Sequence, residues 1–249
     1  MHLREFSMTE WPENTSFEAF KKKWDLQGET LWLNVFEMHR DKMQIKNAEA
    51  AISNLEKIFT ATFELSNRKG FQAMSLRDLS RKTGISMGGL YAYIGSKNDL
   101  ASVIEGVQRK YIDKVIGSLV RDNLEPVACL RAIIFGEIFM MEIMSSWYYF
   151  CFMELKGLPK EQQTFALDVE LRGEDILMGI IRKGINSGKF ICERPDLLAA
   201  QIIAQLQQWH LKQWKFKLRG INTEEYAEYI FKTLLSCLNF KDESSQKPR

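Results

Sequence analysis

Apolar residues recur along most of this chain at intervals of three and four positions, the spacing that places them on one face of an α-helix. The first clear stripe runs through Ile52, Leu55, Phe59 and Phe63. Signals for strands are weak, because no Asn-Gly or Asp-Gly hairpin turn occurs and alternating β-branched runs are few. The pattern therefore predicts an all-α fold.

Glycines and capping residues divide the next stretch into short helices. Ser75-Leu-Arg-Asp78 has the capping-box sequence and opens a helix that Gly84 ends. Ser86 can cap a very short helix over residues 87–93, and a second capping box opens a long helix over about 96–120. The apolar positions that would face inward are Leu76, Leu79, Ile85 and Leu90. A helix, a tight glycine turn and a second helix make the helix-turn-helix pattern.

The remaining chain reads as long helices with short connections. We expect helices near residues 126–144, 146–156, 161–187, 196–218 and 223–238. The first 46 residues are too rich in Trp, Phe and Leu for a disordered tail and predict one or two amphipathic helices, split near Gly28. The predicted organisation is an N-terminal helical extension (1–46), a three-helix DNA-binding domain (47–100), a larger helical ligand-binding and dimerisation domain (101–240) and a polar tail (241–249).

Charge is unevenly distributed along the 249 residues. Residues 56–121 carry 11 Lys and Arg against 6 Asp and Glu, whereas the parts before and after are each slightly acidic. A local basic excess suits a polyanionic partner. A solvated helical face would show the same modest excess, so charge alone leaves both readings open.

Other classes of protein are less well supported by the composition. The four cysteines and three histidines lack the spacing of a metal site, and no nucleophile–base pair or phosphate loop is visible, so we expect no metal, no cofactor and no enzymatic activity. Three carboxylates, Glu137, Glu142 and Glu154, interrupt the longest apolar stretch, which argues against a membrane span. No basic-then-apolar leader is present at the N-terminus, and we expect a cytoplasmic protein.

The stretch Ala61–Val103 resembles the N-terminal domain of TetR-family transcriptional regulators. The matching segments are Gly70-Phe71, Ser75-Leu-Arg-Asp-Leu-Ser80, Thr83-Gly-Ile-Ser86, Leu90-Tyr-Ala-Tyr93, Ser96-Lys97 and Leu100. The resemblance implies binding to a double-stranded DNA operator through the second helix of the motif. It implies DNA contacts, mostly to the sugar–phosphate backbone, by the positions matching Ser75, Arg77, Tyr91, Tyr93 and Lys97.

The start of the recognition helix adds Ser86, Met87 and Gly89 to the expected DNA-binding residues, because the first residues of such a helix face base edges in the major groove. The family usually has a hydroxyl or a charge where Met87 and Gly89 stand, and an aromatic ring where Ile94 stands. These departures support an alternative, a helical lipid-binding sensor or carrier that no longer binds DNA.

The resemblance implies that the C-terminal half binds a ligand. An aromatic and Met-rich block there would suit a small apolar ligand, whose expected contacts are Phe135, Phe139, Met140, Met144, Trp147, Tyr148, Cys151 and Phe152. An ordinary packed core would have the same composition. The segment Gln207–Gly220 looks like a TetR subgroup with members that sense acyl-CoA or fatty acids, and its basic residues would face the phosphates of such a ligand or simply the solvent.

The family also pairs its last two helices across a two-fold axis. The apolar stripes expected at this homodimer seam are Ile202, Ile203, Leu206, Trp209, Tyr226, Ile230 and Leu234. A two-fold dimer implies a roughly palindromic operator. We expect a repressor that a ligand releases from DNA by favouring a state with a different spacing of the recognition helices.

The N-terminal extension is longer than the family's usual arm. One reading is an added element that contacts DNA or stabilises the dimer, through Lys21–Lys23 or through Arg40 and Lys42. The other is a helix pair that covers apolar surface, which the acidic balance and the Trp and Phe content of the segment favour.

Overall fold

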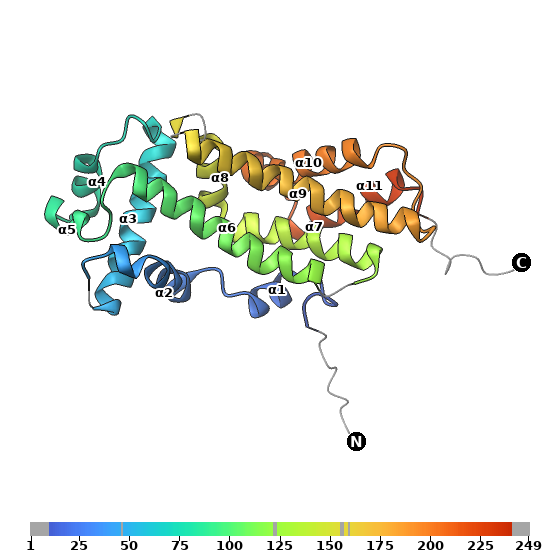
Figure 1. Ribbon diagram of the computed structural model, residues 1–249, viewed down its shortest axis with the longest axis horizontal. Coiled ribbons are helices and arrows are strands. Elements are labelled where there is room, and N and C mark those ends of the chain that lie inside the picture. The colour runs from blue at the N-terminus through green and yellow to red at the C-terminus, as the bar shows by residue number, and fades with distance from the viewer. Residues whose placement is uncertain (1–9, 46, 122–123, 155–156, 159, 241–249) are drawn as a thin grey trace, which may run out of the picture. The chain divides into compact units, whose positions relative to one another are not determined.

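The computed structural model describes residues 10–45, 47–121, 124–154, 157–158 and 160–240. Every regular element in these ranges is helical, which confirms the all-α prediction (Figure 1). The helices are α1 (Phe17–Lys23), α2 (Gly28–His39), the 3-10 turn η1 (Arg40–Lys42), α3 (Ala48–Lys69), α4 (Leu76–Thr83), α5 (Met87–Tyr91), α6 (Lys97–Arg121), α7 (Pro126–Ile143), α8 (Ser145–Met153), α9 (Lys160–Asn186), α10 (Pro195–Leu218) and α11 (Thr223–Cys237). The polar tail predicted at 241–249 lies outside the described residues.

Local signals set the ends of the short helices as predicted. Ser75 caps α4, and the Asp78 carboxylate accepts from the Ser75 backbone, so both halves of the capping box are present. Gly84 ends α4 in the left-handed conformation with φ 72°. The Ser86 hydroxyl accepts from the amide of Gly89 and caps α5.

Helix α5 is two residues shorter than expected. The amides of Ala92 and Tyr93 donate to the carbonyls three residues before them, at 3.2 and 2.9 Å. This 3-10 pattern tightens the last turn and ends the regular helix at Tyr91.

The chain divides into two compact units, neither of which is continuous in sequence. The first unit comprises the residues up to Trp24, Lys114–Glu142 and the residues from Leu171 onward, and the second comprises Asp25–Asp113 and Ile143–Glu170. The N-terminal extension therefore contributes α1 to the first unit and α2 to the second. The sequence predicted four continuous segments, whose limits differ from those of these two units. The predicted domain boundaries stay a prediction.

An aromatic cluster forms the core of the second unit. Trp147 of α8 stacks on Phe59 of α3, with ring centroids 5.3 Å apart, and meets Phe63 edge-on at 5.2 Å. Trp32 of α2 packs against both Phe59 and Trp147. Phe150 continues the cluster from α8 along Phe63. One set of rings thus joins α2 of the extension, α3 and α8.

The first unit has its own aromatic core around Phe139 of α7. Trp11, Phe17 and Phe20 from the N-terminal segment surround this ring at centroid distances of 5.9, 5.1 and 5.5 Å. Gly136 makes room for them, because a β-carbon there would lie 3.4 Å from the Trp11 ring. Both halves of the extension therefore cover apolar surface of their own unit, the reading that its composition favours.

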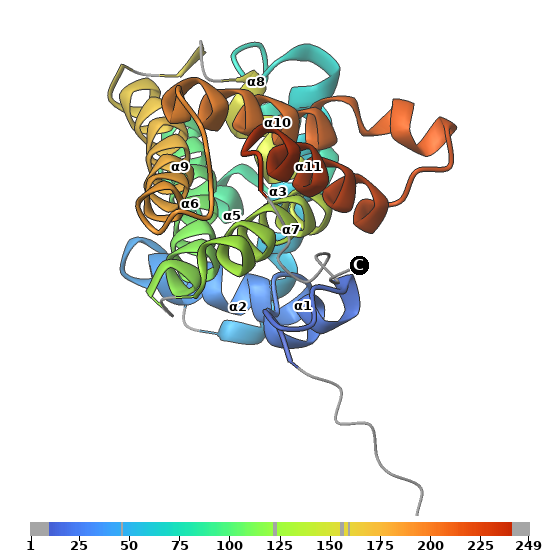
Figure 2. The same ribbon diagram turned by 90° about the vertical axis from the view of Figure 1, so that its right-hand side faces the viewer.

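Helices α10 and α11 pack against each other in the first unit (Figure 2). Trp209 of α10 stacks on Tyr226 of α11, and the Tyr226 hydroxyl donates to the carbonyl of Gln205 at 2.6 Å. Helix α10 is kinked at Lys212, whose backbone leaves helical geometry, and its last turns run off at an angle before the chain returns into α11 (Figure 2). Among the described residues, no helix is long and apolar enough to cross a membrane.

Replacing Trp32 by alanine is expected to lower the free energy of unfolding by about 3–5 kcal/mol, because a buried ring that contacts two others leaves a large cavity. Its neighbour Leu33 is 41% exposed, so Leu33→Ala serves as the matched control and should cost under about 1 kcal/mol. Urea-induced unfolding followed by circular dichroism measures both. A loss below about 1 kcal/mol for Trp32→Ala would show that α2 is not part of the folded second unit.

Candidate DNA-binding and effector regions

Helices α4 and α5 form the helix-turn-helix beside α3 (Figure 1). Leu79 and Leu90 are fully buried and hold the two short helices together. The side chains of Ser75, Arg77 and Ser86 are exposed, and Tyr91 is 50% exposed. The motif therefore presents polar and aromatic groups to solvent at the start of each of its two helices and along the face of the second.

Met87 and Gly89 are half-buried at the start of α5. A β-carbon at Gly89 would lie 2.9 Å from Cγ2 of Ile85, closer than normal packing permits. Glycine is needed here so that the turn can close on Ile85. Its absent side chain is thus explained by the packing of the motif itself.

Tyr93 is placed differently from Tyr91. It is only 6% exposed, and its hydroxyl accepts from the Asn54 amide at 2.8 Å and donates to the carbonyl of Ala50 at 3.4 Å. The ring fastens the end of α5 to α3. A contact between Tyr93 and DNA stays a prediction, and the observed role of the side chain is structural.

Lys97 at the start of α6 is bound to its own chain. Its ammonium donates to the carbonyls of Phe71, Gln72 and Met74, at 3.1, 2.8 and 3.2 Å. All three donors of the lysine are thereby used, and partial burial lowers its pKa. Lys97 closes the turn between α3 and α4, and its expected contact with a phosphate stays a prediction.

Glu154, directly after α8, forms a hydrogen bond with the same turn. The Glu154 carboxylate accepts from the backbone amide of Phe71 at 3.0 Å. Phe71 is fully buried and meets the ring of Phe150 edge-on at 5.0 Å. Glu154 and Lys97 therefore anchor the entrance of the helix-turn-helix to α8 and α6.

The residues expected to bind a ligand fall into both units. Phe135, Phe139 and Met140 of α7 are buried in the first unit, where Phe135 meets Phe139 edge-on. The Arg131 guanidinium lies over the Phe135 ring at 4.4 Å and pairs with the Glu228 carboxylate at 2.7 Å. These side chains serve the packing of the first unit, and their contact with a ligand stays a prediction.

The other expected ligand residues belong to the second unit. Met144, Trp147 and Tyr148 are buried, with Trp147 at the centre of the aromatic cluster, whereas Phe152 is 41% exposed. Cys151 lies on α8 near Glu105 of α6, and burial raises the pKa of its thiol. Glu142 of α7 accepts from the indole of Trp209 at 2.8 Å in the first unit.

Glu105 is a buried acid that the sequence analysis did not single out. It is 6% exposed, its Oε1 has no hydrogen-bond partner, and burial raises its pKa to about 7. Its apolar neighbours Ile104 and Val107 on α6 were the only signal in the sequence that this position faces inward. Near neutral pH the second unit therefore holds a carboxyl group that is close to its point of titration.

The seven residues expected at a dimer seam are used mainly inside the chain. Ile202, Leu206, Trp209, Tyr226, Ile230 and Leu234 are buried in the first unit, and only Ile203 is half-buried. Their role in dimerisation stays a prediction. The exposed apolar residues of the same two helices are Leu197, Trp214, Leu218 and Tyr229.

The Glu105→Gln variant is expected to be more stable than the parent at pH 8 and to lose that advantage at pH 5. The folded-state pKa near 7 lies above the unfolded value of 4.5, so the folded protein retains a proton that the unfolded chain releases, and stability falls as pH rises through this window. A neutral amide removes this cost, a gain of about 2–3 kcal/mol. Urea unfolding at both pH values measures it, and an equal effect at pH 5 and pH 8 would contradict a raised pKa.

Comparisons with known proteins agree with the helix-turn-helix geometry. Residues 58–104 match the family model of the bacterial regulatory proteins, tetR family. The HTH-type transcriptional regulator HbdR of Aromatoleum sp. (strain CIB) is 22% identical over 179 residues, which are 72% of this chain and 76% of HbdR. The HTH-type transcriptional repressor KstR2 of Rhodococcus jostii (strain RHA1) is 25% identical over 174 residues, 68% of this chain and 83% of KstR2.

A solved structure shares the fold. The crystal structure of AibR in complex with isovaleryl coenzyme A and operator DNA superposes with a TM-score of 0.63 at 18% identity, over 76% of this chain and 100% of AibR. The matched motif, the two regulator relatives and the shared helical fold lead to one conclusion. Residues 58–104 match the DNA-binding domain of TetR-family regulators, and most of the chain is similar in sequence and fold to transcriptional regulators of this kind.

Proposed function

We propose that this regulator binds a palindromic operator as a homodimer, represses transcription there, and leaves the DNA when it binds an acyl-CoA or a related small apolar ligand. The observation that carries the proposal is the family-matched helix-turn-helix whose recognition helix exposes Ser86 and Tyr91. A tyrosine there can donate to a phosphate while its ring packs on a sugar or a thymine methyl group.

Exposed apolar side chains support the homodimer. Trp214 is 65% exposed, Leu218 79% and Tyr229 66%, all on α10 and α11. Large apolar groups gathered on two neighbouring helices commonly mark a protein interface. A second copy of the same two helices would bury them by a two-fold contact, in which each patch serves both subunits. The buried apolar residues of α10 and α11 would then hold the two helices in position at the dimer interface.

The ligand class rests on the relatives and on the composition of α7 and α8. AibR was crystallised with isovaleryl coenzyme A and operator DNA, and KstR2 is described as a repressor. The two helices here are rich in Met and aromatic residues, which can repack around an apolar ligand. The basic residues Lys215, Lys217 and Arg219 near the end of α10 are candidates for the ligand's phosphates.

Glu154 gives a route from ligand to DNA. It lies directly after α8 and accepts from the amide of Phe71 at the entrance of the helix-turn-helix. A ligand that displaces α8 would pull on this bond and on the contact between Phe150 and Phe71. A coupling of about 1–3 kcal/mol between the two states would change operator affinity by roughly 5–150-fold.

A second candidate function is a lipid-binding sensor without DNA binding. Two expected DNA contacts, Tyr93 and Lys97, are engaged inside the chain, which favours this alternative. Selection of binding sequences from a random duplex library, followed by anisotropy titrations at several salt concentrations, separates the two functions. The regulator should enrich a palindrome, bind it as two protomers with an affinity that falls steeply with salt, and be released by isovaleryl-CoA but not by coenzyme A. No enrichment and no salt dependence would favour the sensor.

Tyr91→Ala is expected to weaken binding to the selected operator about tenfold or more while the free energy of unfolding stays within about 0.5 kcal/mol, because the ring is half exposed. Tyr93→Phe is the matched comparison and should lower stability by about 1 kcal/mol through its lost hydrogen bonds. Anisotropy and urea unfolding give the two quantities. Unchanged DNA binding in Tyr91→Ala would remove this residue from the interface.

A further inference from the structure

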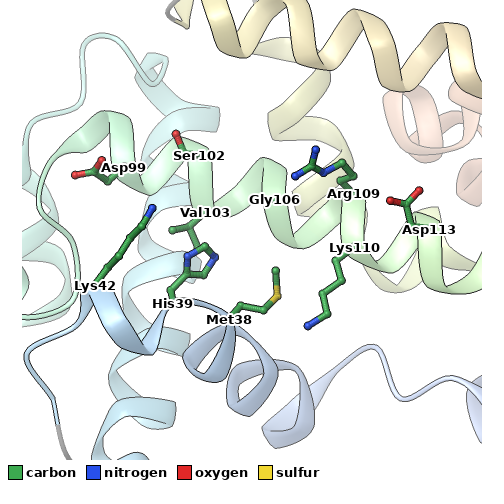
Figure 3. A pocket seen from close by; sticks show the side chains of 10 residues that line it. All are labelled: Met38, His39, Lys42, Asp99, Ser102, Val103, Gly106, Arg109, Lys110 and Asp113. Carbon is green, nitrogen blue, oxygen red and sulfur yellow. The ribbon is translucent and has the colours of Figure 1, made fainter.

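A cavity of about 540 Å³ lies in the second unit between the end of α2 with η1 and the first half of α6 (Figure 3). Its lining from the extension is Met38, His39 and Lys42. Its lining from α6 is Asp99, Ser102, Val103, Gly106, Arg109, Lys110 and Asp113. None of these residues belongs to the aromatic region expected to bind an apolar ligand. The volume is within the range of small-molecule sites, about 300–1,000 Å³.

Two lysines and a histidine line this cavity. Figure 3 shows Lys42 and His39 rising from the extension and Lys110 reaching down from α6, with Asp99 and Asp113 at the two ends of the lining. Neither Lys42 nor Lys110 forms an ion pair with a described residue. The lining carries three cationic side chains, Lys42, Arg109 and Lys110, and two carboxylates, Asp99 and Asp113, so its formal charge is positive.

His39 lies between the two lysines (Figure 3). Its Nε2 is buried without a hydrogen-bond partner. Burial lowers the pKa of the imidazole, and the charges of Lys42 and Lys110 lower it further. Both ammonium groups are thus close enough to His39 to oppose its protonation. A bound anion would oppose that effect and favour the protonated imidazole.

The rest of the lining includes a carboxylate, two apolar side chains and a glycine. Asp99 is occupied at the start of α6, where its carboxylate accepts from the Ser96 hydroxyl at 2.9 Å. Met38 and Val103 add an apolar wall, and the position of a β-carbon on Gly106 is open space. The site thus combines cationic groups with a small apolar surface and free volume.

We propose that this cavity binds a small organic molecule that carries a phosphate group, as an effector site separate from the aromatic region. Lysines bind phosphate as point charges, and a histidine that gains a proton adds a further donor. The segment that lines the cavity also reaches the recognition helix, because the amide of Gln44 donates to the carbonyl of Ala92 at 2.9 Å. Occupancy of the cavity would hold this segment between α6 and the end of α5.

Inorganic phosphate is the probe for the first experiment. The chain has only three histidines, so side-chain NMR of histidine-labelled protein resolves His39 as its pH is titrated with and without phosphate at constant ionic strength. Phosphate should shift the His39 resonance saturably and raise its titration midpoint, while His210, buried in the first unit, stays unchanged. Equal shifts of all the histidines, or a shift of His39 that never saturates, would overturn the site.

Two sets of variants test the residues. Lys42→Ala with Lys110→Ala should weaken phosphate binding at least tenfold, and Lys57→Ala, an exposed lysine on α3, should leave it unchanged. Gly106→Leu should block the cavity without changing a charge, whereas Gly106→Ala should bind phosphate like the parent. Phosphate binding that survives both the double variant and Gly106→Leu would overturn the proposal.

One further outcome identifies a different ligand. If the double variant binds phosphate normally but loses affinity for operator DNA, Lys42 and Lys110 contact the DNA backbone and the small-molecule site is wrong. The phosphate titration itself needs neither DNA nor acyl-CoA. Its failure would therefore leave the proposed repressor function standing, and a failed operator selection would leave the phosphate site standing.

Discussion

The stacking of Trp147 on Phe59 is the contact on which the second unit depends. It joins α8 to α3, and Trp32 completes it from the extension. Aromatic side chains of this size bury about 150–250 Å² each, so a few rings in mutual contact supply much of the stability of a small helical unit. The DNA-binding motif has two very short helices and would gain little from its own packing. Its position follows from the helices that the aromatic cluster holds together.

Polar contacts convert that packing into a defined position for the helix-turn-helix. The Lys97 ammonium donates hydrogen bonds to three backbone carbonyls in the turn after α3. The Glu154 carboxylate accepts from the amide of Phe71 in the same turn. Tyr93 fastens the other end of the motif to α3. The residues that best match the family pattern therefore divide into two kinds. Some face solvent, as Tyr91 does, and others hold the motif in place.

Local sequence signals predicted most of the fold. Capping by Ser75 and Ser86 and the left-handed Gly84 depend on neighbours within a few positions, so the limits of α4 and the start of α5 could be read directly from the residues. The roles of Tyr93, Lys97 and Glu105 depend on partners distant in sequence, and spacing carries no information about them. Burial of Trp209 and Ile202 shows the same limit, because a helical stripe does not reveal whether it faces the chain's own core or a second subunit.

Hydrogen–deuterium exchange of the 249-residue protein tests directly whether the extension folds together with α3 and α8 as one aromatic unit. We expect the slowly exchanging amides of α2, α3 and α8 to open with a common free energy, since one cluster joins all three helices. Exchange in α2 that is orders of magnitude faster than in α3 and α8 would contradict it and would make the extension an appendage of an independently stable motif.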